Sequence, residues 1–252
     1  MAKKSGSLKA KRSATPEFWQ ISRKDKRFVV RTSPGAHPKK YSYPLLVVLR
    51  DVLGLAKTRR EALSVLNEGK VMVDGRIVKS EAFPVGLMDV IDFPGIGKSY
   101  RIVPRSGRLV PVEIDSKEKG LKLCYVKSKK TVAGSKISYG LHDGRVIFPE
   151  AEVDIRPGDA CMIKIPSQEF QGSYRLGKES LALLIRGEKS GEVATVEDLK
   201  PGTYSRGSIA TIRFADGTAS ELPTDVLLPL GKQAPEITLT RTAAPRGLLK
   251  EN

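Results

Sequence analysis

Residues 44–54 carry the first clear cluster of apolar positions in the chain. Apolar side chains recur at spacings of one, three and four from Leu45 to Leu53. Pro44 suits the first turn of a helix, and Gly54 follows the last apolar position. This pattern predicts a short helix with a buried face.

A second helix is predicted directly afterwards. Thr58 and Glu61 have the three-residue spacing of a capping box, which places the helix start at Arg59. The helix should continue to about Glu68, because Gly69 readily adopts the left-handed conformation that ends a helix.

Beyond the second helix the period of the pattern becomes two, which is typical of β-strands. Residues 70–79 alternate around an Asp-Gly pair and predict a tight hairpin. After residue 83, short apolar runs separated by Gly, Pro or Asp turns predict a compact antiparallel barrel or sandwich. These runs are residues 87–93, 100–103, 110–114, 121–126, 136–138, 146–148 and 160–165. A further small β-module is predicted from the runs at 180–186, 192–196, 208–214 and 222–230.

Charge gives the second helix an unusual feature. Lys57, Arg59 and Arg60 lie at its start, where the helix dipole disfavours a cation by roughly 0.3–1 kcal/mol. A phosphate there would meet backbone N–H groups and two guanidinium groups, so the pattern indicates an anion site. The alternative, that these are solvated surface charges, stays open. Three further cations are expected to flank the site: Lys70, Arg76 and Lys79.

The first 44 residues hold most of the excess charge. They contain twelve Lys or Arg and two acidic residues, a net charge of +10, and the rest of the chain adds +6. So basic a segment predicts an arm that orders on a polyanion, with a disordered solubility tail as the alternative. Its obvious anchoring groups are Trp19, Ile21, Phe28 and Val29, and it has no apolar run of the kind found in signal peptides.

Composition bounds the class of protein. A chain of 252 residues with 40% hydrophobic content favours two or three small modules over one large enzyme core. The formal charge of +16 favours a nucleic-acid partner, because neutralised phosphates release counterions. Cys124 and Cys161 lack metal-ligand spacing and are predicted to be small core residues. No apolar run approaches the length of a membrane span, and we expect a cytoplasmic location.

Catalytic and metal-binding groups are not predicted. His37 lies in a Pro/Lys-rich segment and His142 in a turn, neither beside a nucleophile in sequence. Acidic pairs such as Asp89 and Asp92 have the pattern of strand-end charges. Residues 95–99 match a phosphate loop only weakly, because the full GxxxxGK[ST] pattern is missing. We therefore expect no cofactor and no enzyme activity.

The segment from Tyr43 to Ile91 contains LRDVLGLAKTRREALSVLNEGKVMVDG and then FPVGLMDVIDF. It resembles the RNA-binding module first described in bacterial ribosomal protein four, and more closely the version in the archaeal and eukaryotic (e-type) family of small-ribosomal-subunit protein four. GSLKAKRSATPEFWQISRKDKRFVVRTSPGAHPKK resembles the start of that family, GLHDGRVIFPEAEVDIRPGDACMIKIPSQE its central domain, and LLIRGEKSGEVATVEDL its KOW motif. One departure is Glu192 in the KOW turn, where relatives usually have Arg.

The resemblance implies an α+β, multi-domain fold. The expected parts are a basic N-terminal arm (1–42), a small helix-helix-strand RNA-binding module (43–105), a central antiparallel β-barrel-like domain (106–174), a KOW-containing SH3-like β-barrel (175–238) and a C-terminal tail (239–252). The implied function is that of a structural component of the small ribosomal subunit, which binds ribosomal RNA and supports translation. The implied partners are ribosomal RNA and neighbouring ribosomal proteins, with no membrane and no small-molecule substrate.

The candidate RNA contacts are basic side chains of the arm, of the second helix with its hairpin, and of a loop in the central domain. They are Lys3, Lys4, Lys9, Lys11, Arg12, Arg23, Lys24, Lys39, Lys40, Lys57, Arg59, Arg60, Lys70, Arg76, Lys79, Lys127, Lys129 and Lys130.

Two other functions compete with this interpretation. One is an RNA-modifying enzyme of the pseudouridine-synthase type, since such enzymes carry the same small module. They have an Asp after Gly-Arg-Leu, whereas the Gly-Arg-Leu at residues 107–109 precedes Val110. The other is a non-ribosomal RNA-binding regulator.

Overall fold

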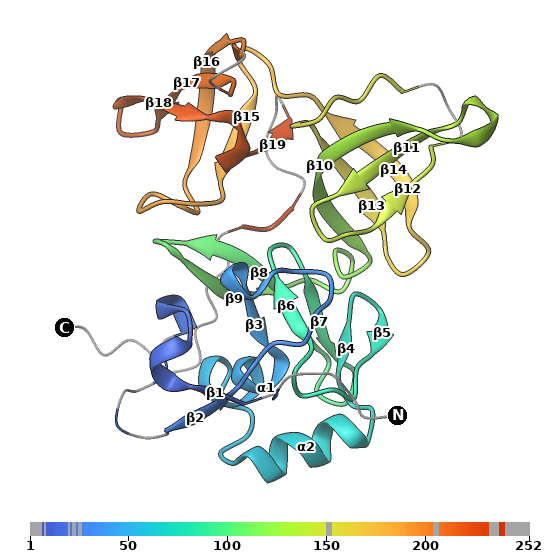
Figure 1. Cartoon of the computed structure of the whole chain (residues 1–252), viewed down its shortest axis with the longest axis vertical. Helices are drawn as coiled ribbons and strands as arrows, with labels where there is room; N and C mark the ends of the chain where they lie inside the picture. Colours follow the sequence, from blue (N-terminus) through green and yellow to red (C-terminus); the bar gives the residue numbers. More distant parts are fainter. Residues whose placement is uncertain are drawn as a thin grey trace. The chain divides into compact units, whose positions relative to one another are not determined.

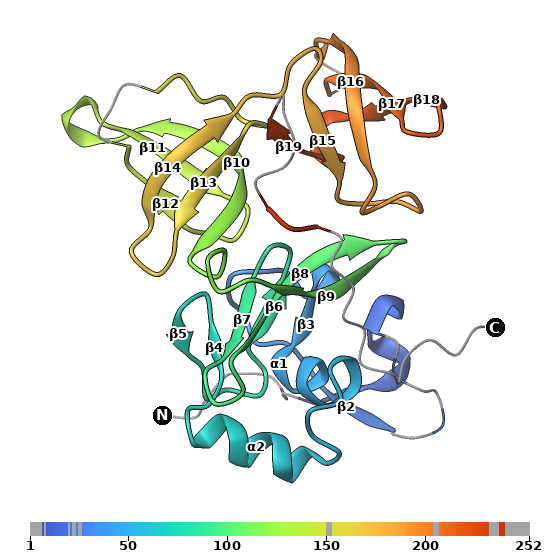
Figure 2. The ribbon, with the colours of Figure 1, turned by 180° about the vertical axis from the view of Figure 1, so that it is seen from behind.

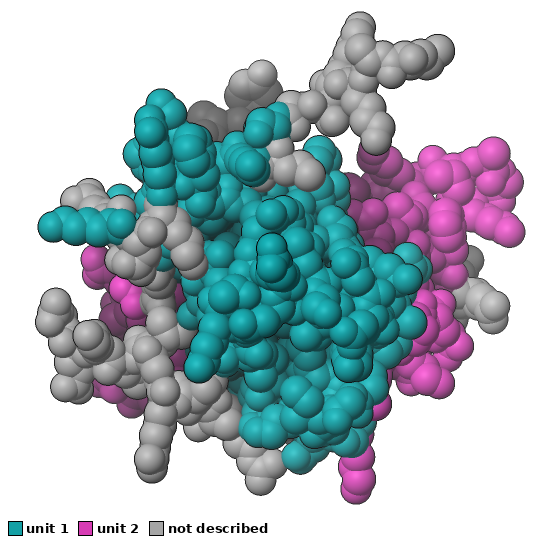
Figure 3. All heavy atoms as spheres, turned by 90° about the horizontal axis from the view of Figure 1, so that it is seen from below, with its two compact units in different colours: residues 1–102, 109–116, 241–252 teal, residues 103–108, 117–240 magenta. Residues whose placement is uncertain are grey.

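The computed structural model describes residues 7, 9–19, 21, 24, 27–149, 153–203, 207–231 and 237–239, in which β-strands predominate (Figures 1 and 2). The chain forms two compact units, coloured separately in Figure 3. Unit 1 contains the described residues up to 102 together with 109–116. Unit 2 contains residues 103–108 and the described residues from 117 onward.

Unit 1 combines short helices with three small sheets. The sheets have the strand orders β1-β2, β3-β6 and β5-β4-β7-β8-β9. The strands are β1 (Lys9–Lys11), β2 (Phe28–Val30), β3 (Ser42–Pro44), β4 (Met72–Val73), β5 (Arg76–Ile77), β6 (Pro84–Gly86), β7 (Val90–Phe93), β8 (Lys98–Arg105) and β9 (Arg108–Ile114). The helical segments are η1 (Arg12–Ala14), η2 (Glu17–Trp19), η3 (Lys39–Tyr41), α1 (Leu45–Val47), η4 (Val48–Val52) and α2 (Arg59–Asn67).

The first predicted helix is present, but its geometry changes along its length. The α-helical turn of α1 continues into η4, which is a π-helix. Residues 45–49 are all buried. The segment is therefore enclosed by the core on every side, which explains why its apolar residues follow one another without a strict helical period.

The second predicted helix is confirmed together with its caps. The Thr58 side chain accepts a hydrogen bond from the Glu61 N–H at 3.2 Å, and the Glu61 carboxylate accepts one from the Thr58 N–H, which completes the capping box. Gly69 has a φ of +72°. The predicted hairpin follows as β4 and β5, and its turn residues Asp74 and Gly75 both have positive φ.

The described part of the basic arm is folded onto unit 1. Trp19 is completely buried, and its indole N–H donates to the Ser42 carbonyl oxygen at 2.9 Å. Ile21, Val29 and Val30 join the same core. These residues are thus ordered without the polyanion that the sequence predicted, because four apolar side chains are enough to attach a short β1-β2 ribbon to a core that already exists. Three of the predicted anchoring groups, Trp19, Ile21 and Val29, are buried, whereas the fourth, Phe28, is exposed.

Unit 2 contains two five-stranded antiparallel sheets and the tip of the β8-β9 hairpin. The first sheet has the order β12-β11-β10-β13-β14, with strands β10 (Leu121–Thr131), β11 (Ile137–Leu141), β12 (Val146–Ile147), β13 (Ala160–Lys164) and β14 (Glu169–Tyr174). The second has the order β18-β17-β16-β15-β19, with strands β15 (Leu181–Leu184), β16 (Val193–Lys200), β17 (Ile209–Phe214), β18 (Ala219–Pro223) and β19 (Leu227–Gly231). Two 3-10 segments, η5 (Ala133–Ser135) and η6 (Thr224–Val226), complete the unit.

Both cysteines are core residues, as predicted. Cys124 on β10 lies directly opposite Cys161 on β13; the two form no disulfide and are fully buried. Burial raises the pKa of the Cys161 thiol to about 12. Both thiols therefore fill small spaces between the strands, and the Cys124 thiol also donates to the Asp143 carboxylate at 3.9 Å.

Candidate nucleic-acid interface

The start of α2 carries the cations that first indicated an anion site. The Arg59 guanidinium forms two hydrogen bonds with the Glu81 carboxylate, from Nε at 2.8 Å and from a terminal nitrogen at 2.6 Å. The Glu61 carboxylate accepts from the Lys57 backbone N–H at 2.8 Å, and this bond is the main reason that its pKa lies below the ordinary value. Two carboxylates of the chain thus already lie at the helix start, and a phosphate there would compete with Glu81 for Arg59.

The other acidic groups in residues 44–91 are also engaged. The Asp74 carboxylate accepts from the Val90 N–H at 2.9 Å, and Asp89 is bonded to His37. The remaining two acidic residues form ion pairs, Asp51 with Arg50 at 2.6 Å and Glu68 with Lys70 at 2.5 Å. Every carboxylate of this segment therefore has a partner within the protein.

Because these carboxylates are engaged, four cations of the segment keep their charge available. Lys57, Arg60, Arg76 and Lys79 are exposed and form no ion pair with any residue in the described part of the chain. Lys57 and Arg60 flank the start of α2, and the other two lie on and just after β5, in the hairpin that follows α2 (Figure 1). Of the cations predicted for this module, Arg59 and Lys70 are thus paired and the other four are not.

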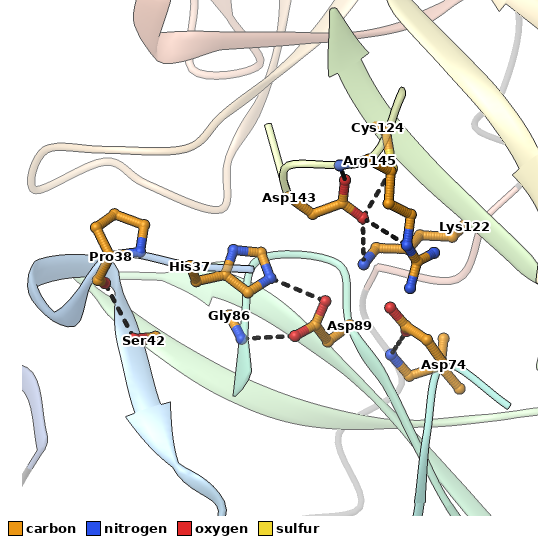
Figure 4. Close-up of polar contacts among 11 residues, drawn as sticks. His37, Pro38, Ser42, Asp74, Gly86, Asp89, Lys122, Cys124, Asp143 and Arg145 are labelled. Atoms are coloured by element: carbon orange, nitrogen blue, oxygen red, sulfur yellow. Dashed lines mark hydrogen bonds and ion pairs between the residues drawn. The ribbon is translucent and has the colours of Figure 1, made fainter. Parts of the chain in front are cut away.

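A buried His-Asp pair links residue 37 to the strands of unit 1. His37 Nε2 lies 3.0 Å from an Asp89 carboxylate oxygen, and the other oxygen accepts from the Gly86 N–H at 2.8 Å (Figure 4). A Cβ at Gly86 would overlap the His37 ring, so the close approach requires glycine. Asp89 was predicted to be a strand-end charge, and nothing in the sequence connects it to a histidine 52 positions away.

The arm cations divide into structural and exposed groups. The Arg12 side chain donates to the Ile21 carbonyl at 2.7 Å and to Thr15, and Lys39 donates to the Ala14 carbonyl at 2.8 Å. The exposed members of the predicted set are Lys9, Lys11, Lys24 and Lys40. Lys3, Lys4 and Arg23 lie outside the described residues.

In unit 2, the predicted basic loop is a strand. Lys127, Lys129 and Lys130 lie on β10, which continues to residue 131 because it pairs there with β11. Lys129 is 3.5 Å from an Asp154 carboxylate oxygen and stands over the Tyr139 ring. Lys127 and Lys130 are exposed.

The cations of the β15–β19 module are mostly paired. The ion pairs are Lys178–Asp198 at 2.8 Å, Lys200–Glu221 at 2.5 Å and Arg213–Glu197 at 2.5 Å. Lys189 lies 4.0 Å from the Phe214 ring centroid. The described residues of this module therefore offer little uncompensated positive charge.

The loop before β16 accepts hydrogen bonds from the tip of the β8-β9 hairpin, which belongs to the same unit. The N–H of Ser106 donates to the Ser190 carbonyl at 2.7 Å, and the N–H of Gly107 donates to the Ser190 hydroxyl at 2.6 Å. Gly191 has a φ of +94°, and a Cβ there would collide with the Pro104 carbonyl oxygen. The backbone of this loop is thus engaged by the β8-β9 hairpin tip.

A fully buried ion pair lies inside unit 2 and was not predicted. Lys122 on β10 is 0% exposed, and its ammonium is 3.0 Å from an Asp143 carboxylate oxygen (Figure 4). Burial opposes ionisation of Asp143, but the charges of Lys122, His142 and Arg145 hold its pKa below the ordinary value. The only sequence signal was a lysine in the middle of an apolar strand run.

No group of three or more potential ligands that could hold a metal ion occurs among the described residues. None of the helices in that part of the chain is both long and apolar enough to cross a bilayer.

The comparisons with known proteins agree on one family. Three family models match: ribosomal family S4e over residues 96–170, the RS4NT (NUC023) domain over 4–40 and the S4 domain over 44–91. Small ribosomal subunit protein eS4 of Staphylothermus marinus is 35% identical over 251 residues, covering 96% of this chain and 100% of the relative. The same protein of Methanocaldococcus jannaschii is 37% identical over 248 residues, covering 95% and 100%. The crystal structure of 30S ribosomal protein S4e from Thermoplasma acidophilum superposes with a TM-score of 0.62 at 29% identity, covering 76% of this chain and 94% of that chain.

Proposed function

This chain belongs to ribosomal family S4e, as a structural protein of the small ribosomal subunit rather than an enzyme, and we propose that unit 1 provides its principal contact with ribosomal RNA. Family membership also supports the predicted partners, which are ribosomal RNA and neighbouring ribosomal proteins in the ribosome. It lends no support to a pseudouridine synthase or to a free RNA-binding regulator.

The proposal rests on the partners of the acidic side chains in residues 44–91. All six carboxylates of this segment are engaged within the protein, and four exposed cations are left without an acidic partner among the described residues. Phosphates attract such cations because each neutralised phosphate releases counterions. We assign Lys57, Arg60, Arg76 and Lys79 as the contacts of this module.

Other basic residues of each unit provide further candidate contacts. Exposed cations of the arm and of β10 can each meet a phosphate without breaking an ion pair between described residues, and these are Lys9, Lys11, Lys24, Lys40, Lys127 and Lys130. Arg12, Lys39, Arg59, Lys70 and Lys129 can reach RNA only by sharing or leaving the partners described above. Lys3, Lys4 and Arg23 remain predictions from the charge of the arm.

Recognition of this kind follows the shape of the RNA. Duplex RNA hides its base edges in a deep, narrow major groove, so contacts with phosphates and 2′-hydroxyls position a protein on it. Several modest contacts on one chain reinforce each other through effective concentration. Specificity then depends on the fixed spacing of the cations within each folded unit.

For the C-terminal part we propose a KOW-containing, SH3-like barrel over residues 175–238, as in the predicted domain order. The strand order β18-β17-β16-β15-β19 and the Gly187–Gly191 turn support this assignment. Its turn binds the β8-β9 hairpin tip, so we propose that this module serves the fold and contacts neighbouring proteins more than RNA.

Sedimentation tests the proposal directly. The tagged native chain should co-migrate with small subunits in a sucrose gradient after a moderate-salt wash, and crosslinked RNA fragments should map to small-subunit RNA. A protein found only at the top of the gradient would show a free regulator instead. Isomerisation of uridine by the purified chain would establish the enzyme alternative.

A further inference from the structure

Phe28 is a large aromatic side chain that unit 1 leaves on its surface. It is 52% exposed, whereas the next two residues of β2, Val29 and Val30, are buried in the core. A single exposed apolar residue is ordinary on a protein surface, so the groups around the ring decide what it can do.

Two cations border the Phe28 ring. The Arg27 guanidinium carbon lies 5.6 Å from the ring centroid. Lys11 is directly opposite Phe28 in the β1-β2 ladder, which places both side chains on one face of the ribbon. Both cations are exposed, and neither forms an ion pair with another described residue.

The ribbon that presents these groups is fixed to the core. The Arg12 N–H donates to the Arg27 carbonyl at 3.1 Å, and the Arg12 side chain donates to the Ile21 carbonyl at 2.7 Å. Val29 is buried beside Phe28. A ligand that meets the ring therefore does not have to order the backbone beneath it.

We propose that Phe28, Lys11 and Arg27 form a binding site for one unpaired nucleotide of ribosomal RNA. The base stacks on the free face of the ring, and its phosphate lies against the two cations. Every nucleobase has a π face, and aromatic stacking next to a cationic groove is how proteins hold single-stranded RNA. This inference rests on the proposed RNA-binding function and adds a base contact to what are otherwise phosphate contacts.

An apolar protein patch fits the site less well. Covering the ring with such a surface would remove water from Arg27 and Lys11 without supplying an anion, which is unfavourable. A nucleotide supplies both a flat apolar face and a negative charge, so its chemistry matches all three side chains.

The test compares the binding of transcribed small-subunit ribosomal RNA by the full chain and by variants at several salt concentrations. Phe28→Ala and Phe28→Leu should each raise Kd by roughly 5- to 150-fold, the range of base–aromatic stacking, without changing the slope of log K against log salt. Phe28→Trp should bind like the wild type, and its emission should be quenched by RNA relative to the Trp19 background. Lys11→Gln should lower the slope by about one.

Phe148→Ala is the matched control, because Phe148 is 55% exposed and belongs to unit 2. It should leave Kd unchanged. Wild-type affinity in Phe28→Ala, or full affinity in Phe28→Leu, would overturn the nucleotide site, since leucine preserves apolar packing but not stacking. If the wild type itself fails to bind the RNA, the proposed function fails; if it binds and the alanine variant binds equally well, only this inference fails.

Discussion

The S4 segment of unit 1 and the β15–β19 module of unit 2 both contain nearly equal numbers of acidic and basic residues, yet they use them in opposite ways. Residues 44–91 have seven Lys or Arg and six acidic residues, and residues 175–238, which contain the second module, have eight and nine. In the first, the backbone and buried groups engage several carboxylates and so leave cations exposed. In the second, exposed carboxylates pair with exposed cations across strands. Net charge alone therefore does not identify an RNA-binding surface; what matters is where the acidic groups are bound.

The largest loss of stability is expected when the buried ion pair of unit 2 is broken. Asp143→Asn removes the carboxylate next to the fully buried Lys122 ammonium, and breaking a buried pair of this kind costs about 3–5 kcal/mol. Denaturant unfolding measures the loss. Asp198→Asn, which alters an exposed pair of the same unit, is the control and should change stability little.

The same pair predicts a pH dependence. The pKa of Asp143 is lowered in the folded protein, so its contribution to stability is fully present above the unfolded value of about 4 and is lost as the pH falls through the lower folded value. The destabilisation caused by Asp143→Asn should therefore shrink in acid. A difference that stays constant from pH 7 to pH 2 would contradict this account of the pair.

Gly191→Ala is the next largest change and tests whether the loop before β16 is engaged by its own unit. A Cβ there meets the Pro104 carbonyl and adopts an unfavourable φ, so unfolding should become easier by about 2–4 kcal/mol. Gly187→Ala is closely matched, because Gly187 has a φ of +95° but open space around it. The Gly187→Ala variant should lose only the free energy of unfolding that the unfavourable φ costs, about 1–2 kcal/mol. Equal losses in the two variants would show that the contact with the hairpin tip contributes nothing.

Removing the cations of each region tests most directly whether unpaired cations bind RNA and paired cations do not. Replacing Lys57, Arg60, Arg76 and Lys79 by Gln should weaken RNA binding tenfold or more and lower the salt slope by up to about three. Replacing Lys178, Lys200 and Arg213 by Gln should leave the slope unchanged, because these cations are paired. Filter binding over a salt series measures both. A larger slope change in the second set would reverse the assignment.

The smallest effect concerns Arg59. Glu81→Gln removes its carboxylate partner and frees an exposed guanidinium at the start of α2. We expect a stability loss below about 1 kcal/mol and a rise in the salt slope of up to about one. Arg59→Gln should leave the slope unchanged if the pair persists in the complex. A lower slope in that variant would show that Arg59 leaves Glu81 for RNA.

Local patterns were sufficient to predict much of unit 1. The capping box of α2, its stop at Gly69 and the Asp74-Gly75 turn depend on neighbours within a few residues, so the sequence specifies them directly. The apolar runs of the β-region likewise predicted most strands. The run at 222–230 was less accurate, because η6 separates β18 from β19 within it.

The candidate site was predicted only as a set of residue types. Local spacing placed Lys57, Arg59 and Arg60 together at a helix start, and this is where they lie. It could not distinguish Arg59 from Arg60, because the difference is a carboxylate 22 positions later in the chain. The loop predicted around Lys127 became a strand for a similar reason, since pairing with β11 is a non-local contact.

By itself, the sequence determined the charge of this protein, its helix caps and turns, its strand periodicity and its likeness to a ribosomal family. These depend on composition and on contacts between near neighbours. Only the tertiary structure decided which cations remain available, that Asp89 binds His37, that Lys122 is buried with Asp143, and that Phe28 stays exposed beside two cations. These outcomes depend on burial by the folded core or on groups that are distant in the chain, such as Arg59 and Glu81 or Lys11 and Phe28. Local spacing can encode only the nearer pairs, such as Arg50 with Asp51.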